Sequence, residues 1–176
     1  MRQLSILRRI LAWRLRNISH RQFIVLLSIV VGFLSGLVAV IIKNLVYVIR
    51  NLLTSGFTED SHNLLYVVFP VLGITGAILF SRYILKRRVE HGIPNVLNAI
   101  SNNKGIIDRH NLFSSIITSA LTVGFGGSVG LEGPTVATGG AVGSNIGRYF
   151  RFNYKDITLL LGCASAGAMA AIFKAP

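Results

Sequence analysis

The chain has 176 residues, of which 52% are hydrophobic and 14% are charged, and its mean hydropathy is +0.61. Soluble domains carry about 25% charged residues, and the deficit here lies in several long uncharged runs. A soluble core helix accounts for one such run but not for several. The composition therefore excludes an ordinary soluble domain and predicts an integral, multi-pass membrane protein.

The net charge is +12, and its distribution predicts the membrane orientation. Arginines crowd residues 1–21, before the first uncharged run, and Arg82, Lys86, Arg87 and Arg88 follow the second. Residues 51–63, between these runs, contain two acids and no Lys or Arg. This positive-inside pattern places the N-terminus in the cytoplasm of a cell-membrane protein and argues against nucleic acid as the partner of the basic residues.

The first third of the chain predicts a basic leader segment and two spans. Residues 1–18 form either an amphipathic helix on the cytoplasmic surface or a basic tail, and both readings stay open. Residues 19–176 form the membrane domain. Within it, residues 22–53 predict one long helix, and residues 64–85 predict a second span in which Pro70 is a candidate kink.

Beyond residue 92 the predicted helices become short. Residues 95–100, 112–125, 134–149 and 157–173 are helical, and residues 102–110 form a polar loop. Glycines spaced by four (Gly126 and Gly130; Gly139, Gly143 and Gly147) predict close helix packing. Short broken helices at membrane depth must be buried in protein or line a polar cavity, and they indicate a transport site. The fold class is all-α: a polytopic membrane helix bundle with short broken helices whose N-termini point to an anion site.

Glu132 is the candidate functional residue, because residues 112–147 contain no other ionisable side chain. A carboxylate in such a setting indicates a function. Gly133 keeps the backbone uncovered, and Pro134 suits the first turn of a helix. Such a turn offers free amides and a partial positive charge to an anion. The Glu132 carboxylate competes for that position until it is protonated. The structural alternative is a helix cap or a partner of a hidden cation.

A second helix start of the same design occurs at Gly92, Ile93 and Pro94, just after the cytoplasmic basic cluster. Two such helix starts can converge on one anion. Alone, this short motif has many chance matches, and its plain interpretation is a turn in a loop.

With these two motifs the chain resembles the CLC family of chloride channels and chloride/proton antiporters. The family's G-S-G-I-P signature corresponds to Glu90-His91-Gly92-Ile93-Pro94, and its G-K/R-E-G-P signature to Gly130-Leu131-Glu132-Gly133-Pro134. Residues 135–140 and 164–176 are also similar to the family. The resemblance implies the first of two inverted halves, incomplete at the C-terminus, and a homodimer formed through the second half. The 176 residues alone are expected to be inactive.

The resemblance implies voltage- or proton-gated anion transport, by a channel or an anion/proton antiporter. Glu132 is then the gate and the outer proton acceptor, and the backbone at Leu131, Glu132 and Gly133 binds the anion. His91 replaces the family's anion-coordinating serine. The anion is then bound either by the His91 ring or by the amides of Gly92 and Ile93. This replacement leaves chloride, fluoride or nitrate open as the preferred anion.

The expected partners are an anion, protons and the lipid bilayer, with neither cofactor nor metal. A membrane enzyme that uses Glu132 as general base is the alternative function, although the four histidines show no metal-binding spacing. A purely structural subunit leaves Glu132 without a role. Cys163 is the single cysteine, which excludes an internal disulfide.

Overall fold

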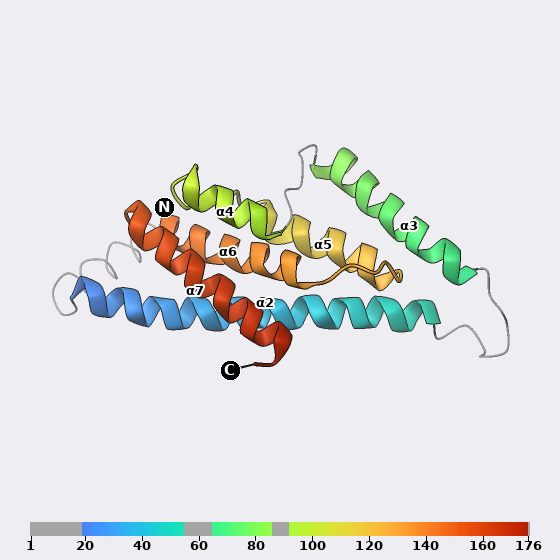
Figure 1. The fold of residues 1–176 in the computed structure, drawn as a ribbon, viewed down its shortest axis with the longest axis horizontal. Coiled ribbons are helices and arrows are strands. Elements are labelled where there is room, and N and C mark those ends of the chain that lie inside the picture. Colours follow the sequence, from blue (N-terminus) through green and yellow to red (C-terminus); the bar gives the residue numbers. More distant parts are fainter. Residues whose placement is uncertain (1–18, 55–64, 86–91, 176) are drawn as a thin grey trace, which may run out of the picture.

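The computed structural model describes residues 19–54, 65–85 and 92–175, and every regular element within these ranges is helical. Figure 1 shows the long helix α2 along the lower side of the view, crossed by α7, with the other helices above it. Helix α2 (His20–Thr54) has 35 residues, which corresponds to about 50 Å at 1.5 Å per residue. It is longer than the hydrocarbon core of a bilayer, about 30 Å, so it can cross with a strong tilt.

Helix α7 (Tyr154–Phe173) crosses α2 at a point where both helices carry glycine (Figure 1). A Cβ atom added to Gly167 would lie 2.6 Å from the carbonyl oxygen of Gly32. A larger residue does not fit at position 167, whereas a Cβ atom on Gly32 would make an ordinary contact, 3.8 Å from the Cys163 carbonyl oxygen. The two backbones meet because neither side chain separates them, which is how membrane helices gain dispersion contacts without a hydrophobic driving force.

Helix α6 (Glu132–Tyr149) packs along α7 through its own glycines. Added Cβ atoms would lie 2.7 Å from the Ala168 Cβ at Gly139 and 2.5 Å from the Leu160 carbonyl oxygen at Gly143. The predicted packing role of these glycines is confirmed. Gly126 and Gly130 were predicted to pack helices in the same way, and that prediction was wrong. Both lie outside the helices, Gly126 with a φ of 90°.

Helix α5 (Asn111–Gly124) contacts both α2 and α3 (Leu65–Leu79). A Cβ atom on Gly73 would lie 2.5 Å from the Phe125 Cβ, so the end of α5 fits tightly against α3. Helix α3 runs through Pro70 as a continuous helix, and the departure from α-geometry comes later, in the π-helical turn η1 (Phe80–Leu85). The two together form the second predicted span.

Helix α4 (Ile93–Ser101) and the loop of residues 102–110 cover α6 from another side. The buried Ser144 hydroxyl of α6 accepts a hydrogen bond from the Ile107 amide at 2.9 Å and donates one to the Gly105 carbonyl at 2.6 Å. Val96 and Ala99 of α4 join Ile107 in one apolar cluster with α6. These contacts hold the start of α4 at a defined position relative to α6.

Within the part of the chain that the structure describes, three helices are long and apolar enough to cross a membrane: His20–Leu53, Val68–Leu85 and Tyr154–Phe173. The outer face of α2 exposes large apolar side chains such as Phe33 and Ile29, as lipid contact requires. The predicted helices therefore appear with only small differences at their ends. The largest is at α7, which begins at Tyr154, three residues before the predicted start at residue 157. Helix α6 begins two residues early, at Glu132 and not at Pro134. The prediction for residues 1–18 lies outside the described residues.

Candidate functional site

The first turns of α4 and α6 lie against each other, backbone to backbone. A Cβ atom added to Gly133 would lie 3.4 Å from the Gly92 Cα. Gly92 is the residue before α4 and has a φ of 82°, a conformation that glycine adopts without strain. Two helix starts that are far apart in the sequence therefore meet at two residues without side chains, as the two similar motifs suggested.

Several amides at this meeting point have no hydrogen-bond partner among the described residues. The first helical bond into α6 joins the Thr135 amide to the Leu131 carbonyl at 3.0 Å. The amides of Glu132 and Gly133 precede it and so have no acceptor within the helix, and they donate to no other described residue. The same holds for the Ile93 amide in the first turn of α4. Free amides and aligned helix dipoles favour negative charge here.

Glu132 is the first residue of α6, and its carboxyl group folds back over Gly130. A Cβ atom on Gly130 would overlap Oε2 of Glu132 and would lie 3.1 Å from its Cδ. The sequence predicted that the Glu132 carboxyl group is removed from water. Among the residues that the structure describes, however, Glu132 is exposed, whereas residues 135–141 are buried. The described helices cover α6 from its second turn onward and leave its first residue open.

The other predicted site residues lie around the two helix starts, except for one that the structure does not describe. Leu131 caps α6 and is half-buried, and Ile93 begins α4 with its side chain 46% exposed. Gly92 and Gly133 form the close backbone approach. His91 lies outside the described residues.

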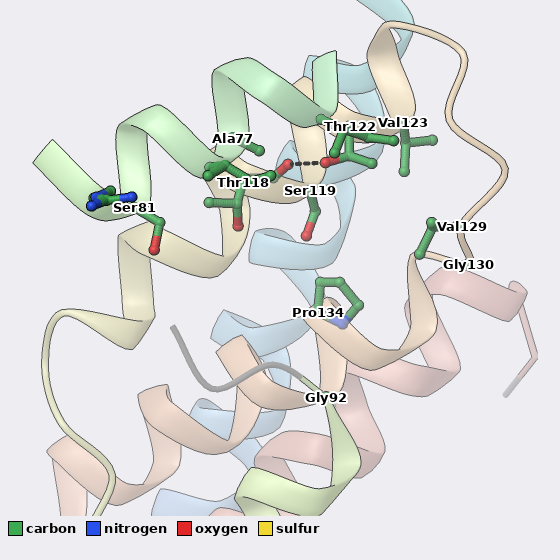
Figure 2. Close-up of a pocket in the computed structure, with 13 residues that line it drawn as sticks. Ala77, Ser81, Gly92, Thr118, Ser119, Thr122, Val123, Val129, Gly130 and Pro134 are labelled. Carbon is green, nitrogen blue, oxygen red and sulfur yellow. Dashed lines mark hydrogen bonds between the residues drawn. The ribbon is translucent and has the colours of Figure 1, made fainter. Parts of the chain in front are cut away.

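A cavity of about 570 Å³ adjoins both helix starts (Figure 2). Gly92 lines it at the start of α4, and Gly130 and Pro134 line it around the start of α6. Its opposite walls come from α3 with η1 and from α5, through apolar and hydroxyl side chains and Arg82, and most of the lining surface is apolar. The cavity is therefore a space of mostly apolar lining that ends at the backbone of the two helix starts.

Sequence reasoning missed the polar side chains of this cavity, which are Ser81 and Arg82 of η1 and Thr118, Ser119 and Thr122 of α5. Arg82 entered only as one member of the cytoplasmic basic cluster. Ser119 belongs to a set of hydroxyl residues, with Thr118 and Thr122, that falls on one side of a short membrane helix. That spacing was the only indication in the sequence of a polar helix face. It does not show which hydroxyl group donates to a carbonyl of its own helix and which does not.

The described residues contain no group of three His, Cys, Asp or Glu side chains that could hold a metal ion. The chemistry available at the helix starts is that of free backbone amides, one carboxyl group and nearby hydroxyls. Such groups can bind and release an anion, and the carboxyl group can also accept a proton.

A family model and several known proteins match this chain, and all of them are described as chloride channels or chloride transporters. The family model described as "Voltage gated chloride channel" matches residues 72–176. The H(+)/Cl(-) exchange transporter ClcA of Vibrio cholerae serotype O1 is 30% identical over 159 residues, which cover 87% of this chain and 34% of that protein. The ClcA proteins of Vibrio vulnificus and Salmonella arizonae are 30% and 29% identical with the same coverage. The chain spans about a third of the length of these relatives.

Proposed function

Because the chain belongs to the CLC, or voltage-gated chloride channel, family, we propose that it forms part of an anion pathway that carries chloride, coupled to protons, across the membrane. The observation that carries this proposal is the approach of Gly92 to Gly133, which brings two helix starts with free amides together beside Glu132. The name of the ClcA relatives, H(+)/Cl(-) exchange transporter, supports exchange of these two ions.

In this proposal the anion binds at the amides of the two helix starts, at residues 92–93 and 131–133. Partial positive charge from both helix dipoles stabilises it there. The Glu132 carboxylate is held over Gly130 at the first turn of α6 and competes with the anion for this partial positive charge. Protonation removes its negative charge and so removes both its attraction to the amides and its repulsion of the incoming anion. The proton that Glu132 takes up then travels against the anion.

The chain is proposed to lie in the cell membrane with its N-terminus in the cytoplasm, as the positive-inside pattern requires. Residues 19–176 belong to the membrane domain in this scheme, and residues 1–18 lie at its cytoplasmic surface. Since the chain spans about a third of its relatives, a second inverted half and a homodimer are proposals about the whole protein. The choice among chloride, fluoride and nitrate depends on His91, which replaces the family's serine.

The membrane-enzyme alternative has no support from these comparisons. Both the family description and the names of the relatives describe the transport of ions.

Anion flux in liposomes tests the proposal. The full-length gene product should show chloride flux that rises as the pH falls, because protonation of Glu132 opens the site. Glu132→Gln is expected to lose most of this pH response, because its amide side chain carries no charge for protonation to remove. The matched control is Asp108→Asn, an exposed acid in the loop between α4 and α5, which should keep the wild-type pH response.

Two outcomes would contradict the proposal. Absence of any anion-dependent flux from the wild-type protein would overturn anion transport. A Glu132→Gln variant with the wild-type pH response would leave transport in place but remove Glu132 as the gate.

A further inference from the structure

One serine of α5 faces the cavity without a partner. Ser119 is 7% exposed and lines the cavity. Figure 2 shows its hydroxyl group pointing into the space between α5 and Pro134. It forms no hydrogen bond with another residue in the ranges that the structure describes. Ser119 is thus largely enclosed by protein, while its hydroxyl group keeps a donor that a ligand in the cavity can use.

The neighbouring hydroxyl groups of α5 differ from Ser119 in this respect. Thr118 donates to the Ser114 carbonyl at 2.8 Å, and Thr122 donates to the Thr118 carbonyl at 2.9 Å (Figure 2). Both hydroxyl protons are therefore used within the helix. Of these three cavity-lining hydroxyl groups, only that of Ser119 is free to donate to something inside the cavity.

The charge of the lining indicates the kind of ligand. Arg82 is the one charged residue that lines the cavity within the described chain, and no acid lines it. Its guanidinium group is a permanent positive charge, set on the π-helical turn η1. Arg82 is exposed, and the remaining lining carries no other charge that would compete with it within the described chain. Such a space favours a small anion over a cation or a neutral polar molecule.

We propose that the Ser119 hydroxyl group donates a hydrogen bond to a small inorganic anion in this cavity, and that Arg82 raises the anion concentration at its mouth. The inference rests on the proposed function and deepens it by naming a side-chain ligand on α5. The anion then reaches the amides at Gly92 and Gly133 from the cavity, because Gly92 and Pro134 line the same space. Ser119 sets affinity, and Arg82 sets the rate of capture.

The experiment compares hydroxyl removal at two neighbouring positions. Full-length protein is reconstituted in liposomes, chloride flux is measured against chloride concentration, and chloride binding is measured by calorimetry in detergent. Ser119→Ala should weaken apparent chloride affinity about tenfold, as expected when a charged acceptor loses one neutral donor. Ser119→Thr keeps the hydroxyl group and should restore most of the affinity. Thr122→Val removes a hydroxyl group bound to its own helix and should change the affinity less than about twofold.

Arg82 is tested by ionic strength. Arg82→Gln should slow chloride uptake at low salt, and the difference should disappear at high salt, because screening removes steering by an exposed charge. Arg82→Lys keeps the charge and should behave like the wild type.

The outcomes separate this inference from the proposed function. If the wild-type protein carries chloride while Ser119→Ala keeps the wild-type affinity, Ser119 is not a ligand and the inference is overturned. Equal losses in Ser119→Ala and Thr122→Val overturn it too, since they indicate a packing effect. If the wild-type protein neither binds nor carries chloride, the proposed function itself fails.

Discussion

Helix α6 contacts its neighbours in two different ways along its length. From Gly139 to Gly147 its glycines bring it against α7, and added Cβ atoms would collide with backbone atoms of that helix. In its first turn, Gly133 brings its backbone to Gly92 of the α4 start, at a distance that an added Cβ atom would just tolerate. One part of α6 is closely packed, and the other presents free amides.

This difference shows that glycine serves two physical purposes within one helix. Along α7, the missing side chain gives close backbone contact and dispersion energy. At the α4 start, the missing side chain leaves polar backbone groups uncovered, so that a ligand can reach them. The packed part fixes the position of the helix, and the uncovered part can then hold an anion at a defined place. Substitutions in the two parts should therefore affect different properties.

The largest effect is expected from Gly143→Val, in the packed part. Its Cβ alone would lie 2.5 Å from the Leu160 carbonyl oxygen, and backbone atoms cannot move aside without separating α6 from α7. Overpacking of this kind costs about 1–3 kcal/mol or more. Thermal unfolding in detergent should show a clear loss of stability, and expression should fall.

Gly162→Ala is the matched control for this substitution. Gly162 lies in α7 with no atom within 4 Å of an added Cβ, and alanine is the better helix former by about 1 kcal/mol. The control should be neutral or stabilising. Equal destabilisation by both variants would mean that glycine contacts do not hold α6 to α7.

An intermediate effect is expected from Gly130→Ala, at the uncovered end. The new Cβ would take the space of the Glu132 carboxyl group and displace it from its position over residue 130. Stability should change little, because Gly130 is exposed. The flux at neutral pH should change by about tenfold or more, since a misplacement of about 1 Å can change a rate by about a hundredfold. Liposome flux as a function of pH measures this, and an unchanged profile would show that the carboxyl position is unimportant.

The smallest effect is expected from His20→Gln, which tests whether a polar contact between two side chains contributes to the packing of α7 on α2. The His20 Nε2 lies 3.0 Å from Asp156 Oδ2 and joins the starts of α2 and α7. The His20 side chain is 53% exposed, and exposed pairs contribute about 1 kcal/mol or less. A double-mutant cycle with Asp156→Asn should give a coupling energy in that range. A much larger coupling energy would show that electrostatics, and not glycine packing, holds α7 to α2.

The sequence by itself determined the helices and the class of protein. Uncharged runs, proline positions and glycine spacing are local properties, and they predicted α2, α5, α7 and the span formed by α3 and η1 closely. The E-G-P motif pointed to Glu132 and to the correct family for the same reason, since a helix start and its free amides are encoded within a few residues. The four-residue glycine spacing was correct at residues 139–147 and misleading at Gly126 and Gly130, because spacing has meaning only where the chain is helical.

Only the tertiary structure decided how these parts combine. The approach of Gly92 to Gly133 depends on how α4 packs on α6 through Ser144 and the Val96 cluster, which no local pattern encodes. The free hydroxyl group of Ser119 depends likewise on side-chain orientation, because its neighbours Thr118 and Thr122 have the same chemistry but donate to their own helix. Hydrogen bonding and burial are properties of the surroundings, and those surroundings exist only once distant segments have packed together.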